Sequence, residues 1–164
     1  MLATDPIALQ ALRELAVPPS TDLLLIEALA DHAWDCAEGE GTDLERIARG
    51  QGYTLTADPT LPRGWRGLLL GDELVYRPHR DPYQERVVIA HEVGHCVARR
   101  ARLRMAHPDI WRLSLAVLAR RAVVQQTRAL SSPATHAAVL AAHAGVPWWA
   151  AAARLEHRPI TLVA

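Results

Sequence analysis

The sequence predicts an α+β fold that is mostly helical, with a small three-stranded antiparallel sheet packed beside one long helix. Apolar residues recur at helical spacing along most of the chain, which is typical of helices that bury one face. Residues 53–77 instead form short β-prone runs separated by turns. The 164 residues contain no internal repeat or linker, so we expect a single domain. Its expected parts are N-terminal helices at 1–41, a core at 42–130 and short C-terminal helices at 131–164.

The N-terminal part, residues 1–41, carries two predicted helices. Residues 6–16 and 22–37 have apolar side chains at helical spacing, and two consecutive prolines separate them. Ser20 or Thr21 is expected to cap the second helix, because a side-chain oxygen at that position can accept from a free backbone N–H.

The central part, residues 42–130, begins with a capping pattern in which Thr42 precedes Glu45 by three positions. A short helix is therefore expected from Thr42 to about Gly50, where glycines end it. Strands are expected at residues 53–56, 65–70 and 73–77, the last two joined in a hairpin by Gly71 and Asp72.

A long helix is expected after the hairpin. Asp81 can cap it, a proline follows at the first helical position, and the helix should run to about Arg102. Pro108 can open a further helix, whose apolar spacing extends towards Val124. The tail predicts two short helices around a turn at Gly145.

The composition excludes several classes of protein. No apolar run approaches the roughly 20 residues that cross a bilayer, so we expect no transmembrane helix and no membrane partner. The N-terminus lacks the basic start and apolar core of a secretory signal, and Cys36 and Cys96 do not form a C-x-x-C pair. A reduced, cytoplasmic location is therefore expected. The net charge of zero gives no general reason to expect nucleic-acid binding.

Charged residues are nevertheless distributed unevenly along the chain. Acidic residues predominate in residues 1–45, and arginines predominate in residues 99–128. We expect these two segments to attract each other or to attract different partners.

The chemistry is expected to lie in the long helix, where residues 91–95 form an H-E-x-x-H motif. His91 and His95 are four residues apart and therefore lie on one face of the helix, where both imidazoles can bind one ion. Glu92, one step around the helix, can reach a water bound to that ion and act as the general base. Two histidines and a carboxylate suit zinc, with manganese as the alternative, and leave a position open.

The third metal ligand is expected to be Asp109. The extended metzincin motif would place a histidine at position 101, where this chain has Ala101. Asp109 follows the loop after the motif and is the only acid between Glu92 and Glu156. A competing interpretation is that Asp109 only stabilises the start of its own helix. His107 is the alternative third ligand, and Glu156 is a more distant one.

Three residues shortly before the motif are candidates for stabilising a transition state: Tyr76, His79 and Tyr83. Each could donate a hydrogen bond to the oxyanion of a tetrahedral intermediate. Each could equally pack at the end of the sheet, and the sequence does not choose between these roles.

Several segments resemble the ImmA/IrrE metallopeptidase family. They are residues 44–48, the hairpin at 67–77 and the motif at 86–95, and residues 139–155 are similar to that family's closing helices. The resemblance covers about residues 42–157. It implies a zincin-like minimal core and a third ligand that the family usually takes from a glutamate, onto which Asp109 aligns.

The resemblance also implies a substrate. Members of the family cleave helix-turn-helix repressors of the Cro/C1 type inside bacteria and so relieve repression after DNA damage or other stress. The expected function is a zinc-dependent endopeptidase that cleaves such a repressor in a stress, DNA-damage or mobile-element response. The alternative is a catalytically idle partner of a repressor or toxin–antitoxin pair with a structural metal site, and the need for Glu92 discriminates the two. Direct nucleic-acid binding is not expected, because Trp148 and Trp149 stand where a recognition helix would carry base-reading polar groups.

Overall fold

The computed structural model of the chain describes residues 5–62 and 64–156. The α+β class is confirmed, and the structure is 60% helical with a small three-stranded sheet. The elements in chain order are α1 (Pro6–Leu15), α2 (Leu23–Asp35), α3 (Asp43–Gly50), β1 (Thr54–Ala57), β2 (Gly67–Leu70), β3 (Glu73–Tyr76), α4 (Pro82–Arg100), α5 (His107–Leu118), α6 (Arg121–Leu130), α7 (His136–Ala144) and α8 (Trp148–Glu156).

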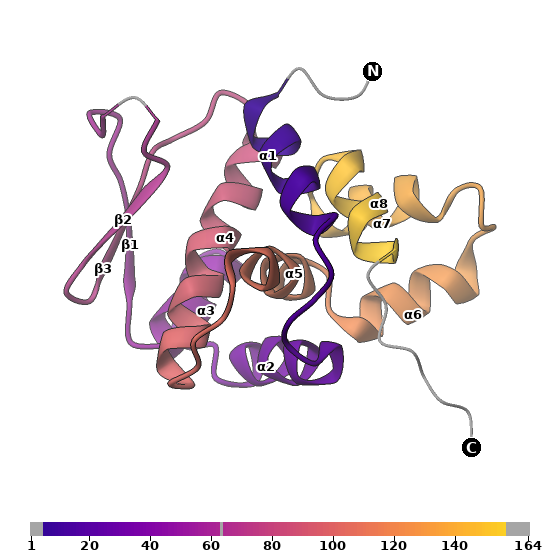
Figure 1. Cartoon of the computed structure of the whole chain (residues 1–164), viewed down its shortest axis with the longest axis horizontal. Helices are drawn as coiled ribbons and strands as arrows, with labels where there is room; N and C mark the ends of the chain where they lie inside the picture. Colours follow the sequence, from indigo (N-terminus) through magenta and orange to yellow (C-terminus); the bar gives the residue numbers. More distant parts are fainter. Residues whose placement is uncertain (1–4, 63, 157–164) are drawn as a thin grey trace.

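Helix α5 forms the centre of the helical body. Its residues from Asp109 to Leu118 are all buried, as expected of a helix that is apolar on nearly every side. Helices α4 and α2 make its most extensive contacts, and α1 and α8 pack against its remaining sides. Figure 1 shows α5 surrounded by α1, α2 and α4, with the sheet beyond α4.

Helices α4 and α5 approach each other closely at Gly94. A Cβ atom added to Gly94 would lie 2.7 Å from Ser114 Oγ and 3.4 Å from the Ile110 carbonyl oxygen, so only glycine fits without a shift. This close approach brings the first turn of α5, which begins at His107, beside the middle of α4.

The sheet has the order β1-β3-β2 and is mixed, not antiparallel throughout. Strands β2 and β3 form the expected antiparallel hairpin, in which Gly67 pairs with Tyr76. Strand β1 instead runs parallel to β3, with Thr54 opposite Glu73. The expectation of a fully antiparallel sheet was wrong because β3 inserts between β1 and β2. Strand β2 is therefore left at an edge, with one side of its backbone unpaired within the sheet.

The predicted helix starts are confirmed at α3 and α4. Thr42 and Glu45 form a reciprocal capping box, and the Asp81 side chain accepts from the backbone N–H of Tyr83. The expected cap of α2 was wrong, because the Asp22 side chain caps this helix by accepting from the Leu24 N–H at 2.7 Å.

The segment after α5 also differs from the expectation. One helix was predicted to extend from Pro108 towards Val124, but α5 ends at Leu118 because Ala119 has non-helical backbone angles (φ −134°, ψ 88°). A separate helix, α6, follows. In the tail, α7 and α8 flank Gly145 as expected, with Gly145 in the left-handed conformation (φ 63°). Residues 157–164 of the expected C-terminal part lie outside the described residues.

Ion pairs join the acidic and basic segments. Arg120 lies 3.6 Å from Asp31 and 3.8 Å from Asp35, which confirms that the two segments attract each other.

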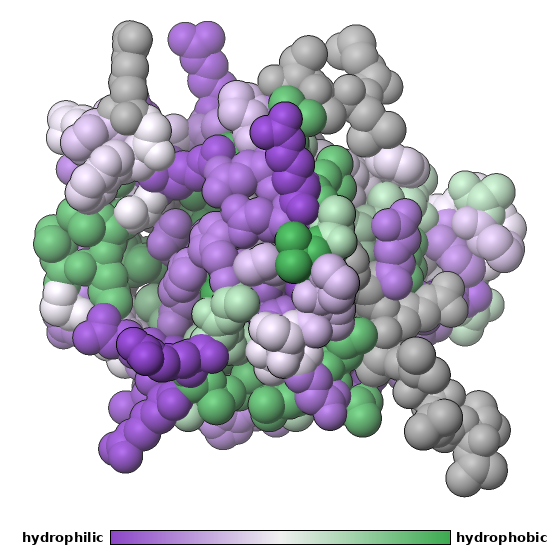
Figure 2. Space-filling model, viewed as in Figure 1, coloured by the Kyte–Doolittle hydropathy of each residue, from purple (hydrophilic) through white to green (hydrophobic). Residues whose placement is uncertain are grey.

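Figure 2, viewed as in Figure 1, shows hydrophilic surface over the centre of the molecule and hydrophobic surface over the sheet. None of the helices described is long and apolar enough to span a membrane.

Candidate metal centre

Three histidines meet where α4 and α5 come together. His91 and His95 project from one face of α4, as their spacing predicts, with ring centroids 4.9 Å apart. His107, the first residue of α5, places its ring 4.7 Å from that of His91 and 5.6 Å from that of His95. One ligand atom from each residue can be chosen so that all three lie within 4.8 Å of one another. This group could hold a metal ion.

The distance between two of the ring nitrogens suits such an ion. His91 Nε2 and His107 Nε2 are 3.0 Å apart. Two nitrogens bound to a tetrahedral zinc ion at about 2.0–2.1 Å would be about 3.3 Å apart, so a small adjustment of the rings accommodates an ion. His95 completes the set from the exposed side, where water has access.

The protonation state of the histidines also suits a metal. Burial lowers the pKa of His91 well below its usual value of 6.5, and the neighbouring His95, His107 and Arg66 lower it further. Burial, followed by the charge of His107, likewise lowers the pKa of His95. Both imidazoles are therefore neutral at neutral pH, which is the form that binds metal ions.

A carboxylate from the N-terminal helix holds the third histidine. Glu14 of α1 forms a short contact with His107 Nδ1, which leaves Nε2 facing His91. A carboxylate on the outer nitrogen of a metal-binding histidine fixes the orientation of its ring and makes it a stronger ligand. The indole of Trp111, one turn into α5, lies against the His91 ring with centroids 4.0 Å apart. Glu14 and Trp111 thus position the group.

Asp109 does not belong to this group, contrary to the expectation that it supplies the third ligand. Its side chain is fully buried, and Oδ2 accepts from Ser20 N, Ser20 Oγ and Thr21 N at 2.6–3.2 Å. Oδ1 accepts from Arg112 Nη1 at 2.9 Å. Four hydrogen bonds from within the fold therefore hold this carboxylate, three of them on Oδ2. His107, the alternative third ligand, does belong to the group of histidines that could hold a metal ion.

Glu92 lies beside the histidines and against the edge strand. A Cβ added to Gly67, the first residue of β2, would lie 2.4 Å from Glu92 Cδ. Glycine therefore permits β2 to pass directly over this carboxylate. Burial raises the pKa of Glu92, while the charges of His107 and Arg66 oppose the increase. A carboxylate with a raised pKa is a better proton acceptor at neutral pH.

The three residues proposed as stabilisers make no hydrogen bond, ion pair or ring contact with the three histidines in the described part of the chain. Tyr76 ends β3, and burial together with the charges of Glu85 and Glu45 raises its pKa. His79 Nδ1 accepts from the Asp81 backbone N–H at 3.0 Å. Tyr83 is 54% exposed. The oxyanion role of all three therefore stays a prediction.

Arg66 is the basic residue that the structure brings to the site and the sequence did not indicate. It immediately precedes Gly67, and its charge acts on both His91 and Glu92. Glu14 was also missed. Neither residue belongs to a motif with fixed spacing, so no signal in the sequence could have selected them from the other arginines and acids.

No protein-family model matches this chain, and no curated protein matches it.

Proposed function

We propose that this protein is a metal-dependent endopeptidase in which His91, His95 and His107 hold a divalent ion and Glu92 is the general base. The observation that carries the proposal is the meeting of three imidazoles from two helices with a half-buried carboxylate beside them. Three nitrogen ligands with one open position favour zinc, and manganese is the alternative.

When bound, such an ion supplies Lewis-acid chemistry, by lowering the pKa of water and polarising the carbonyl of a peptide. Glu92 accepts the proton of the attacking water and later donates it to the leaving amine, for which its raised pKa is suited. Glu14 keeps the His107 ring in one orientation, and Trp111 does the same for His91.

Strand β2 is the proposed docking edge for the substrate. It lies at the edge of the sheet and passes over Glu92 at Gly67. An extended peptide that pairs with the free side of β2 would run past Glu92, held by backbone hydrogen bonds that depend little on sequence. A folded target must therefore present an exposed loop or unfold locally before it is cleaved.

The proposed substrate is a helix-turn-helix repressor of the Cro/C1 type. This step rests on the resemblance of residues 42–157 to ImmA/IrrE metallopeptidases. In that role the protein would act in the cytoplasm and relieve repression during stress, DNA damage or activation of a mobile element. It needs no nucleic-acid surface of its own, since it acts on the repressor.

The test combines metal content with cleavage. The full chain, purified without chelator, should contain about one divalent ion and should cleave the repressor encoded beside its gene. Glu92→Gln should keep the ion and lose cleavage, because an amide keeps the shape of the side chain but cannot accept a proton. Glu40→Gln, a change at an exposed acid with no described contact to the histidines, is the matched control and should remain active.

Full activity of Glu92→Gln would refute the mechanism. Binding of the repressor without cleavage, unchanged in Glu92→Gln, would instead support a catalytically idle partner with a structural metal site.

A further inference from the structure

A cavity of about 410 Å³ opens between the start of β2, the N-terminal end of α1 and α4. Pro6 and Ile7 of α1 form one side, and Val88 of α4 forms the floor. Val88 lies four residues before Glu92 and therefore one helical turn away on the same face. The cavity is thus adjacent to the proposed general base, where a residue next to the cleaved bond would lie.

Among the described residues, the wall of this cavity is apolar apart from three basic side chains. They belong to Arg66, Arg77 and His79, and no acidic residue among the described ones lines the cavity. Arg77 has one partner, since its Nη1 donates to the Leu61 carbonyl oxygen. His79 Nε2 lies 3.6 Å from an Asp5 carboxylate oxygen.

Arg66 differs from the other two basic residues because its donors are free. In the described part of the chain, its guanidinium makes no hydrogen bond and no ion pair. Burial lowers the pKa of Arg66, and the charges of Asp5, Glu92 and Glu14 oppose this shift from longer range. The carboxylates of these acids stabilise the charge of the half-buried Arg66 side chain without accepting a hydrogen bond from it.

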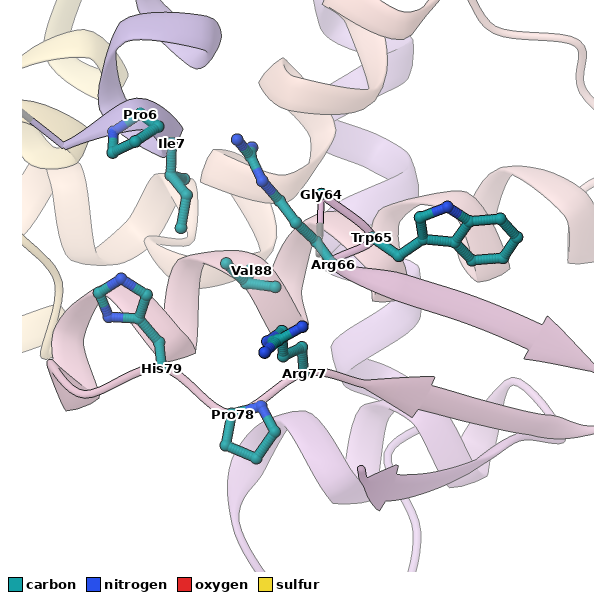
Figure 3. Close-up of a pocket in the computed structure, with 9 residues that line it drawn as sticks. All are labelled: Pro6, Ile7, Gly64, Trp65, Arg66, Arg77, Pro78, His79 and Val88. Carbon is teal, nitrogen blue, oxygen red and sulfur yellow. The ribbon is translucent and has the colours of Figure 1, made fainter. Parts of the chain in front are cut away.

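Figure 3 shows how the side chains are directed. Arg66 extends from the start of β2 towards the side on which Pro6 and Ile7 lie, while the Trp65 ring turns away from the cavity. The guanidinium therefore belongs to the lining of the cavity, and its charge also acts on His91 and Glu92. The planar guanidinium of Arg66 can donate two parallel hydrogen bonds to a carboxylate. An apolar cavity beside it therefore suits a ligand that has an apolar part and a carboxylate.

We propose that this cavity binds a carboxylate-bearing residue of the peptide substrate, and that Arg66 is the residue that selects it. The apolar walls hold the aliphatic or aromatic part, and Arg66 donates two parallel hydrogen bonds to the carboxylate. The carboxylate can belong to an acidic side chain or to the C-terminus of the peptide. This inference deepens the proposed peptidase function and rests on it for the identity of the ligand as a peptide.

Binding of small probes tests the cavity without requiring catalysis. The full chain is titrated with 3-phenylpropionate and with its neutral analogue 3-phenylpropionamide, and binding is followed by NMR, first with a chelator present and then with zinc. The acid should bind about tenfold or more tightly than the amide in both conditions, because a charge-assisted hydrogen bond favours the carboxylate. In Arg66→Met the acid and the amide should bind with about equal affinity. In Arg66→Lys part of the preference for the acid should remain. Arg100→Met, at an exposed arginine of the same protein, is the control and should keep the full preference.

The source of the carboxylate is distinguished by two blocked peptides. One is a tripeptide amide with a central glutamate, and the other is an acetylated dipeptide with a free C-terminal carboxylate on phenylalanine; each is compared with its uncharged amide analogue. An Arg66-dependent preference for either peptide supports the proposal and identifies the source. Equal binding of acids and amides by the wild-type chain, or a preference that survives Arg66→Met, overturns it. Because the readout is binding, failure of this site is distinguishable from failure of cleavage, which would refute the proposed function instead.

Discussion

Replacement of Asp109 by alanine should destabilise the fold without removing the metal site. Asp109 and Arg112 form a buried ion pair, with 0% and 3% of their residue surfaces exposed. Arg112 also donates to the backbone carbonyls of Leu15 and Val17, and Asp109 accepts from Ser20 and Thr21. These hydrogen bonds from Asp109 and Arg112 hold the segment between α1 and α2 against the central helix, α5.

The magnitude follows from the burial of the pair. Removal of one partner of a buried ion pair costs about 3–5 kcal/mol, because the other charge stays buried without compensation. That cost is a large fraction of the roughly 5–15 kcal/mol by which a domain is stable. At about 2–4 °C per kcal/mol for a chain of this size, the melting temperature of Asp109→Ala should fall by about 6–20 °C.

Urea unfolding followed by circular dichroism measures the loss, and the metal content of the folded fraction is measured in parallel. The double variant Asp109→Asn/Arg112→Met should be less destabilised than the sum of its single variants, because both charges leave together. Glu40→Ala, at an exposed acid, should change the free energy of unfolding by less than about 0.5 kcal/mol. A loss below about 1 kcal/mol in Asp109→Ala, or loss of metal with the stability unchanged, would refute this assignment and restore Asp109 as a ligand.

Three further variants test the site and the fold. His107→Ala should lose most of the bound metal at unchanged fold by circular dichroism, whereas retention of one ion per chain would exclude His107 as a ligand. Glu14→Gln should weaken metal affinity about 10–100-fold by competition with a chelating dye, and equal affinity would show that its contact with His107 is incidental. Asp43→Asn should cost about 1 kcal/mol near pH 7, because Arg86 and backbone hydrogen bonds outweigh burial and hold the pKa of Asp43 below its usual 3.8. The stabilisation exists above pH 4 and is lost as the pH falls through the lowered pKa. The free energies of unfolding of wild type and variant should therefore approach each other as the solution is acidified. A difference that does not change between neutral and acidic pH would contradict this explanation.

The two motif histidines and Glu92 could be predicted because they depend on a single helix. A helix fixes the relative directions of residues four apart, and the start of α4 was itself marked by Asp81 and a proline. The third histidine of the group lies on a second helix that is reached through a loop. His107 and Asp109 are two residues apart and point about 160° apart around α5, so only one can face α4. The sequence does not show which one does.

The pairing of the strands could likewise be predicted only in part from the sequence. The hairpin could be predicted from Gly71 and the residues around it, because a tight turn fixes its antiparallel register. The direction of β1 relative to β3 depends on which strand lies in the middle, and alternation along a strand contains no information about its neighbours. The place of Arg66 beside Glu92 follows from that topology, which is why it was visible only in the structure.

The contact between Glu14 and His107 links ion binding to the attachment of the N-terminal helix. Because α1 supplies Glu14 and also walls the cavity with Pro6 and Ile7, detachment of this one helix would disturb both sites while leaving α4 and α5 packed together. By thermodynamic linkage, an ion that binds more tightly to the attached form adds to the free energy of this local opening. Amide protons of α1 should then exchange with solvent more slowly as the ion concentration rises. The bound ion would thus stabilise the packed position of the first helix of the chain.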